Sequence, residues 1–329
     1  MTVNEKPYTH VEVTHEWGRL EEVIVGIQPH DRFIITDFGG GYEYMEKPYS
    51  TLCRDHCGKQ LLEVDPELAI AFERQADGLA ALMEARGVRV RRLQYPEGAD
   101  NHVGLGTGEG PLVYARDPIA VIGNHVIELA ASEGWRERER FAVRPVIAEF
   151  VENSNAKWVA MPPPAPNLPA DAPRLEGGAI LVNGSEIYVG CGGFVSTNAG
   201  IRWLQQYLGE SYTVYEVPLS VEWMHLDGAL SLLRDGLALR STNYLLEPLP
   251  GALASFEFID VTPDEADQLG CNVLILDENT VVMDTRTGDR IASEVQKRGI
   301  EVIHHDYDAV HAMGGGMRCS HHPIRRVVT

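Results

Sequence analysis

The sequence predicts an α/β fold in which one supersecondary unit recurs around a common axis, as in a propeller or another closed array. Four segments share the same order: a polar opening residue, an apolar strand, a tight turn and a second strand. The opening residues are Asp117, Glu176, Asp227 and Asn272, which lie 59, 51 and 45 residues apart. Recurrence at this spacing is typical of structural repeats. We therefore expect residues 1–329 to form a single domain.

Turn signals separate the two strands of each unit. The turns are Gly123-Asn124, Asn183-Gly184, Asp235-Gly236 and Glu278-Asn279. Asn-Gly and Asp-Gly favour type I′ hairpins, because both central residues of that turn need φ > 0. Helices are expected between units, over residues 199–208 and 289–298.

The N-terminal part of the chain supplies a further unit. Residues 20–27 are a short β-branched run and are predicted to be a buried strand, and residues 88–93 are predicted to be a second strand. Between them, residues 64–86 predict an amphipathic helix with Asp65 as its N-cap. Residues 28–60 are rich in Gly, Tyr, Asp and Pro and have no steady period. We expect them to form a long loop that closes over a substrate as a lid.

The composition is that of a globular protein, with 44% hydrophobic and 23% charged residues. A formal net charge of -20 argues against nucleic acid and anionic membrane surfaces as partners, since both select basic patches. The acidity still permits a local pocket that binds a small cation. No apolar run is long enough to span a membrane, and the N-terminus lacks a secretory pattern.

The five cysteines are scattered, which predicts a reducing cytoplasm rather than a disulfide framework. Cys53, His56 and Cys57 form one short cluster without a second pair of ligands, so zinc is not predicted. We expect neither a metal nor another cofactor.

Cys319 stands apart because it follows the loop Gly314-Gly-Gly-Met-Arg. Glycines such as Gly316 allow φ > 0 and the close approach of another molecule. A cysteine on such a loop is a candidate nucleophile, and the alternative is a small buried residue beside a flexible turn.

The carboxylates among the opening residues are expected to converge, because radial repetition places equivalent positions around one axis. Asp117, Glu176 and Asp227 would repel one another in a low-dielectric pocket unless a cation joined them. The alternative is that each acid caps a strand at the surface. Their shared place in the repeat favours convergence on a cationic partner.

Six segments form a recognisable set: Glu16-Trp-Gly-Arg-Leu-Glu-Glu-Val-Ile-Val-Gly26, Ala115-Arg-Asp117-Pro, Val121-Ile-Gly-Asn-His-Val-Ile-Glu128, Met224-His-Leu-Asp227, Asn272-Val-Leu-Ile-Leu-Asp-Glu and Gly314-Gly-Gly-Met-Arg-Cys319. Together they resemble the amidinotransferase superfamily, which includes glycine and inosamine-phosphate amidinotransferases, arginine deiminases and dimethylarginine hydrolases. The resemblance covers almost the whole chain in order. It implies a five-bladed pseudosymmetric α/β propeller of the pentein type with a central active site. It also implies a catalytic set of Cys319, His225 and carboxylates from the earlier blades.

Two branches of the superfamily are represented in the motifs. Where amidinotransferases usually carry Phe-Asp-Ala-Ala, this chain has Leu175-Glu-Gly-Gly178, which is similar to the deiminases and other hydrolases, although Ala179 replaces their usual Asp. Met317-Arg-Cys319 also resembles the deiminases, whereas the N-terminal half and the blade lengths resemble the small bacterial transferases.

Guanidino chemistry needs a strong nucleophile, because charge delocalisation makes the guanidinium carbon a poor electrophile. Cys319 would supply it as a thiolate. Asp117 and Glu176 are expected to pair with the guanidinium N–H groups, and Asp227 to share this role or to orient His225. His225 is the expected proton carrier. His225 and Asp227 are predicted on one side of a strand, since residues i and i+2 face alike.

Two further expectations concern the substrate. Arg318 is predicted to meet a substrate carboxylate, with Arg116, Arg202 and Arg234 as alternatives. Because carboxylates raise a thiol pKa and a bound cation lowers it, Cys319 is predicted to be a thiol in the free protein and a thiolate when a guanidinium binds.

Three functions remain open from the sequence. The first is an amidinotransferase that takes L-arginine or an analogue and an amine acceptor. The second is a hydrolase of the same fold, such as an arginine deiminase or dihydrolase, which uses water. The third is a non-catalytic propeller that binds a cation. A homo-oligomer is compatible with each of them.

Overall fold

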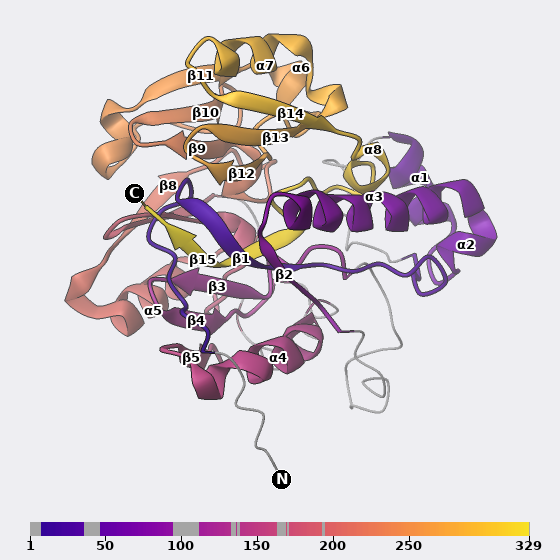
Figure 1. The fold of residues 1–329 in the computed structure, drawn as a ribbon. Helices are drawn as coiled ribbons and strands as arrows, with labels where there is room; N and C mark the ends of the chain where they lie inside the picture. Colours follow the sequence, from indigo (N-terminus) through magenta and orange to yellow (C-terminus); the bar gives the residue numbers. More distant parts are fainter. Residues whose placement is uncertain are drawn as a thin grey trace.

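The computed structural model describes residues 8–35, 47–94, 112–132, 136, 139–162, 169, 171–192 and 195–328, with the backbone alone at 47 and 48. Within these residues the strands form five three-stranded sheets (Figure 1). In each sheet the middle strand runs antiparallel to one neighbour and parallel to the other. The predicted five-bladed α/β propeller is thus confirmed.

The blades follow one another along the chain. The first blade contains β15 (His321–Val327), β1 (Arg19–Val25) and β2 (Arg89–Arg92), and the second contains β3 (Ile119–Ile122), β4 (His125–Glu128) and β5 (Lys157–Ala160). The third blade contains β6 (Ile180–Asn183), β7 (Glu186–Cys191) and β8 (Thr213–Pro218), and the fourth contains β9 (Leu230–Arg234), β10 (Leu237–Ser241) and β11 (Glu257–Val261). The fifth blade contains β12 (Leu274–Asp277), β13 (Thr280–Asp284) and β14 (Glu301–His305). The hairpins β3–β4, β6–β7, β9–β10 and β12–β13 occupy the four predicted repeats.

A crossover joins the middle strand of each blade to its parallel neighbour, as parallel pairing requires. The crossovers contain α3 (Pro66–Ala85), α4 (Glu139–Phe150), α5 (Asn198–Leu208), the 3₁₀ helix η7 (Gly251–Ser255) and α7 (Asp289–Gln296). The shorter helices are α1 (Lys47–Asp55), α2 (Leu61–Val64), α6 (Pro263–Ala266) and α8 (Asp308–His311). In Figure 1 the four longer crossover helices lie on the outside of the sheets.

The two ends of the chain close the ring of blades. Strand β15 pairs antiparallel with β1, from Arg19 opposite Val327 to Val25 opposite His321, and the two lie side by side in Figure 1. Strand β15 was not predicted from the sequence. The Arg326 side chain is buried in this strand, and its guanidinium donates to the carbonyl oxygens of Gly18 (2.6 Å) and Ile275 (2.9 Å).

The N-terminal segment is partly as predicted. Helix α3 begins after Asp65, whose carboxylate accepts a hydrogen bond from the Leu68 N–H group at 3.0 Å, and Gly87 with φ +82° follows its end. The expectation of an irregular loop over residues 28–60 is wrong at Lys47–Asp55, which form α1. Residues 36–46 lie outside the described residues, and the lid role of this segment stays a prediction.

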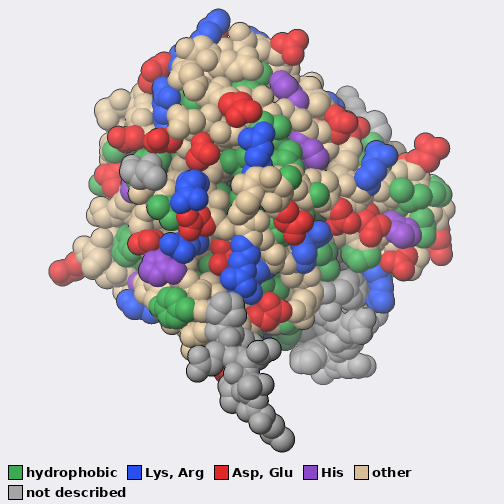
Figure 2. Space-filling view, viewed as in Figure 1, with side chains coloured by type: hydrophobic (Ala, Val, Ile, Leu, Met, Phe, Trp, Pro, Cys, Tyr) green, Lys and Arg blue, Asp and Glu red, His purple; other side chains and the backbone are tan. Residues whose placement is uncertain are grey.

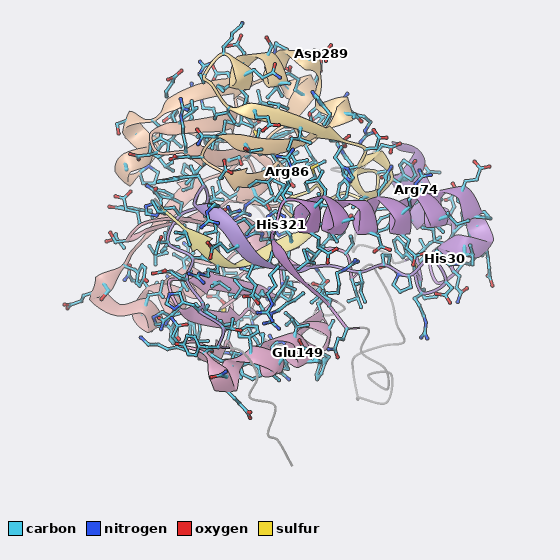
Figure 3. All side chains as sticks on the ribbon, viewed as in Figure 1. His30, Arg74, Arg86, Glu149, Asp289 and His321 are labelled. Atoms are coloured by element: carbon cyan, nitrogen blue, oxygen red, sulfur yellow. The ribbon has the colours of Figure 1, made fainter. Side chains whose placement is uncertain are left out.

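Most of the buried side chains are apolar, and the surface carries mixed charge. All four residues of β3 are buried, because each blade packs between its neighbours and the outer helices. Figure 3 places His321 among the sheets, whereas Arg74, Glu149 and Asp289 lie on outer helices. On the face in Figure 2, acidic and basic side chains are interspersed. None of the described helices combines the length and apolar character needed to cross a membrane.

Candidate active site

The site lies where the blades begin. Asp117 precedes β3, Glu176 is the N-cap of the 3₁₀ turn η4 (Gly177–Ala179), and His225 is the N-cap of η6 (Leu226–Gly228). The two turns lead into β6 and β9. The opening positions of successive repeats therefore meet, as the repeat predicted for Asp117, Glu176 and Asp227.

Backbone hydrogen bonds join these openings directly. The Gly177 N–H group donates to the Asp117 carbonyl oxygen at 3.0 Å, and the Gly178 N–H group donates to Asp117 Oδ1 at 2.9 Å. A Cβ atom at Gly178 would lie 2.6 Å from His225 Nδ1 and 2.8 Å from Asp117 Oδ1. The Glu-Gly-Gly sequence thus allows the acid and the imidazole to approach the backbone closely.

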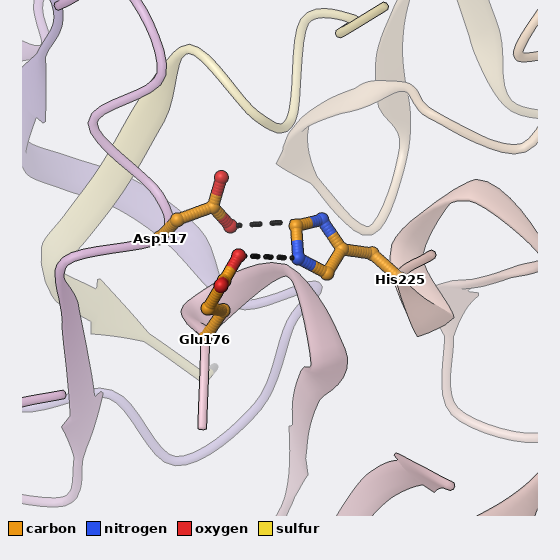
Figure 4. A group of neighbouring side chains, drawn as sticks. All are labelled: Asp117, Glu176 and His225. Atoms are coloured by element: carbon orange, nitrogen blue, oxygen red, sulfur yellow. Dashed lines mark hydrogen bonds and ion pairs between the residues drawn. The ribbon is translucent and has the colours of Figure 1, made fainter. Parts of the chain in front are cut away.

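His225 faces two carboxylates from earlier blades (Figure 4). Its Nε2 is 2.9 Å from Glu176 Oε2, and its Nδ1 is 3.8 Å from Asp117 Oδ1. Burial alone would lower the pKa of His225, but Asp117 and Glu176 outweigh it and raise the pKa to about 9. Burial would raise the pKa of Glu176, but Arg136 and then His225 lower it to about 2. At neutral pH the two residues therefore form an imidazolium–carboxylate pair.

Arg136 is a member of this cluster that the sequence analysis missed. Its guanidinium donates to Asp117 Oδ2 at 2.7 Å and to Glu176 Oε2 at 2.8 Å. Glu139, the first residue of α4, accepts from Arg136 Nε at 2.9 Å. Ser132 completes the pairing of Glu176, since its N–H and hydroxyl groups donate to Oε1 at 2.8 and 2.9 Å.

Asp117, Glu176 and His225 also carry the donor types of a metal site, with ligand atoms that lie within 4.8 Å of one another. In this structure, however, Arg136 donates to an oxygen of each carboxylate, and His225 is hydrogen-bonded to Glu176. A metal would have to displace those hydrogen bonds. We therefore interpret the cluster as an acid–base site.

Cys319 adjoins Asp227 and Asn272, the opening residues of the fourth and fifth blades. Asn272 Nδ2 donates to Cys319 Sγ at 3.2 Å, and the thiol is 3.8 Å from Asp227 Oδ2. Asn272 Oδ1 also accepts from the Arg318 N–H group at 2.9 Å, so this opening residue holds the cysteine loop in place. Burial, followed by the charges of Asp227 and Asp117, raises the pKa of Cys319 well above its ordinary value.

A pocket opens beside the thiol. Its lining includes Cys319, His225, Asp227 and Asn272, together with Trp223, Met224, Gly228, Leu269 and Gly314. The expectation that His225 and Asp227 share one face of a strand is wrong, because Leu226–Gly228 form the turn η6. Both side chains nevertheless line the pocket. Burial raises the pKa of Asp227, although Arg318 and His225 oppose this effect.

Arg318 does not fit its predicted contact with a substrate carboxylate. Its side chain is buried, and it donates to Asp227 Oδ2 at 3.0 Å and to both carboxylate oxygens of Glu16 at 3.1 Å. It also donates to the Ile180 carbonyl oxygen at 2.9 Å. Arg318 therefore anchors Asp227 from within the protein. The alternative Arg116 is buried as well, whereas Arg202 lies exposed on α5 and Arg234 ends β9.

Gly316, which was predicted to contact a substrate, lies against the side chain of Asn272. Among the described residues of the glycine-rich loop, Gly314 lines the pocket beside Cys319 and Gly316 does not. A Cβ atom at Gly316 would lie 2.5 Å from Asn272 Oδ1. The glycine therefore leaves room for the contact with Asn272 that orients the cysteine loop, and its contact with a substrate stays a prediction.

The five blades bring together a cysteine, a histidine and carboxylates, and the chain is similar over nearly its whole length to amidinotransferases. No family model matches the chain. Inosamine-phosphate amidinotransferase 1 of Streptomyces griseus is 27% identical, covering 96% of this chain and 97% of that protein. L-arginine:L-lysine amidinotransferase of Pseudomonas savastanoi pv. phaseolicola is 26% identical, covering 94% and 93%. These full-length likenesses confirm the resemblance to the superfamily.

Solved structures have the same fold. An amidinotransferase of Microseira wollei from a saxitoxin biosynthetic pathway superposes with a TM-score of 0.82 at 22% identity, covering 97% of this chain and 98% of that chain. The N-terminal domain of a cyanobacterial arginine dihydrolase has a TM-score of 0.67 at 15% identity, covering 93% and 99%. The propeller therefore occurs in both transferases and hydrolases.

Proposed function

We propose that this protein is an amidinotransferase that moves the amidino group of L-arginine to an amine acceptor through a covalent adduct on Cys319. The observation that carries the proposal is the meeting of Cys319, Asp227 and His225 in one pocket. The full-length likeness to amidinotransferases, one of which is named for L-arginine and L-lysine, supports the same reaction.

Binding is governed by charge. Asp227 lies beside the thiol, and Asp117 faces His225 from the second blade. Both carboxylates can accept hydrogen bonds from a guanidinium. The arriving cation offsets the charges that raise the pKa of Cys319, so the thiol releases its proton to solvent and the thiolate forms beside the guanidinium carbon.

The first half of the reaction breaks the bond between the guanidinium carbon and the donor nitrogen. The Cys319 thiolate attacks the carbon and forms an S–C bond, which gives a tetrahedral adduct. His225, held as imidazolium by Glu176, donates a proton to the departing nitrogen, which leaves as a neutral amine. Cys319 then carries the amidino group as an isothiouronium cation, and His225 is neutral.

The second half reverses these steps with another nucleophile. Neutral His225 takes a proton from the acceptor amine, whose nitrogen attacks the amidino carbon. Collapse of this second tetrahedral adduct expels the Cys319 thiolate and releases a new guanidino compound. The donor and acceptor amines thus use the same histidine in turn.

A hydrolase of the same fold is the second candidate, and the Glu176-Gly-Gly178 sequence favours it. This sequence resembles the hydrolase branch, and the likeness to an arginine dihydrolase supports the same fold. Water would then replace the acceptor amine, and His225 would deprotonate it. The geometry of His225 and Glu176 is suited to either nucleophile.

Incubation with L-arginine, with and without a panel of amines, tests the proposal. We expect ornithine only when an acceptor is present, together with a new guanidino product. Formation of citrulline and ammonia without an acceptor would show that the protein is a deiminase and not a transferase. Absence of turnover, together with absence of an adduct mass on Cys319, would reject both enzymes and leave the cation-binding propeller.

The ionisation of Cys319 gives a separate prediction. In the free protein the rate of alkylation by iodoacetamide should rise only at a pH above the ordinary thiol range, because burial and then Asp227 raise the pKa of Cys319. A non-reacting guanidinium ligand should move the curve to lower pH. Quantifying the labelled Cys319 peptide by mass spectrometry checks this, with the half-buried Cys191 as an internal control. A curve that does not move with ligand would contradict the proposed activation.

A further inference from the structure

One guanidinium of the protein already lies among the acids of the site. Arg136 Nη2 donates to Asp117 Oδ2 at 2.7 Å, and its Nη1 donates to Glu176 Oε2 at 2.8 Å. Its Nε and Nη2 also donate to the two oxygens of Glu139, at 2.9 and 3.2 Å. The side chain is only 7% exposed. A fixed planar cation therefore joins carboxylates from the second and third blades.

This cation removes a conflict that the two acids would otherwise create. Asp117 and Glu176 are both buried and both face His225. A single imidazolium cannot fully balance two adjacent carboxylates in a low-dielectric interior. The fork of an arginine can hold one oxygen of each acid in a fixed direction, which a lysine cannot do.

The arrangement also divides the carboxylate oxygens between two tasks. Arg136 holds Asp117 Oδ2, whereas Asp117 Oδ1 is directed toward the backbone of Gly178 and toward His225. Within the described part of the chain, Arg136 does not line the pocket beside Cys319, and Asp227 does. A substrate can therefore enter the pocket while Arg136 keeps its partners.

We propose that Arg136 is a permanent positioning residue, which holds Asp117 and Glu176 against His225 and leaves Asp227, the carboxylate that lines the pocket, for the guanidinium of the substrate. The part of this inference that concerns the substrate rests on the proposed function. The alternative is that Arg136 acts as an internal mimic of the substrate, which must leave before the substrate can bind.

Three variants of the full chain test this inference. Arg136→Ala removes the cation, and Arg136→Lys keeps the charge but loses the fork. Arg144→Gln is the matched control, because Arg144, on the helix α4 that follows Arg136, pairs at 2.9 Å with the buried Glu128, which is not among the acids that Arg136 contacts. For Arg136→Ala we expect kcat to fall by about 10²-fold or more, as when preorganised hydrogen-bond donors are removed, with little change in KM. Arg144→Gln should keep the wild-type kcat.

Added guanidinium at millimolar concentration gives a second readout. It should fill the space left in Arg136→Ala and restore at least part of kcat, while Arg136→Lys stays impaired. A lower KM with unchanged or higher kcat in Arg136→Ala would overturn the inference and establish the internal mimic. An equal loss of kcat in Arg144→Gln would also overturn it, because it would make the effect one of general destabilisation.

A thermal measurement separates this inference from the proposed function. Guanidinium that binds the folded state of Arg136→Ala should raise the Tm of this variant. The change in Tm that guanidinium causes in Arg144→Gln should equal the change that it causes in the wild type. This readout needs no turnover, so it remains decisive even when L-arginine proves not to be a substrate. Guanidinium that shifts the Tm of both variants equally would reject a specific site at Arg136.

Discussion

Replacement of Cys319 by alanine is expected to abolish amidino transfer, with a loss on the order of 10⁵-fold or more, because no other thiol lines the described pocket to carry the amidino cation between donor and acceptor. The thiol lies in the pocket with His225 and Asp227, and Asn272 holds it at 3.2 Å. The remaining groups can still bind a guanidinium and polarise it, but they cannot form the S–C bond.

The covalent adduct on Cys319 can be detected directly by mass spectrometry, in addition to the rate. Intact-mass spectrometry of the wild type, quenched during turnover of L-arginine, should find an amidino adduct that maps to Cys319. The Cys319→Ala protein should bind the substrate and show no adduct. Cys191→Ala is a suitable control, because Cys191 is a free, half-buried thiol at the end of β7. Retained turnover in Cys319→Ala would refute covalent catalysis at this residue.

The blades were predictable because their signal is local. Each opening residue is followed by a strand, a short turn and a second strand, and this order recurs four times along the chain. Strand β15 carried no such signal. Its sequence His321-His-Pro-Ile-Arg-Arg326 is polar, yet five of these six residues are buried, because β15 completes the blade that contains β1. Only the closed ring explains why polar residues are buried there.

The acids of the site could be predicted from their place in the repeat, whereas the two arginines could not. Arg136 lies in a stretch of alternating charges, Glu133-Gly-Trp-Arg-Glu-Arg-Glu-Arg140, which looks like a solvated surface. Arg318 follows a glycine-rich loop and looked available to a ligand. In the structure it reaches Glu16, which is 302 residues away in the chain. Long-range ion pairs of this kind leave no periodic trace in a sequence.

His225 should be nearly as important as Cys319. For His225→Asn we expect kcat to fall by about 10³- to 10⁴-fold, because both half-reactions lose their proton carrier. Burial would lower the pKa of His225, but Asp117 and then Glu176 raise it to about 9, so the imidazolium is the main form at neutral pH. The acid form is lost as the pH rises through that pKa. Wild-type kcat should therefore decline at alkaline pH, and the variant should lack this decline.

Comparing two donors that differ in their leaving group tests whether His225 carries the proton. A donor analogue in which a sulfur replaces the departing nitrogen releases a thiolate, which needs no proton. His225→Asn should therefore form the Cys319 adduct from this isothiourea but not from L-arginine, and the adduct should persist because no base activates the acceptor. His125→Asn is the control, since His125 is hydrogen-bonded to Tyr207 at 3.0 Å in the second blade. Equal impairment with both donors would show that His225 holds the site together instead of carrying the proton.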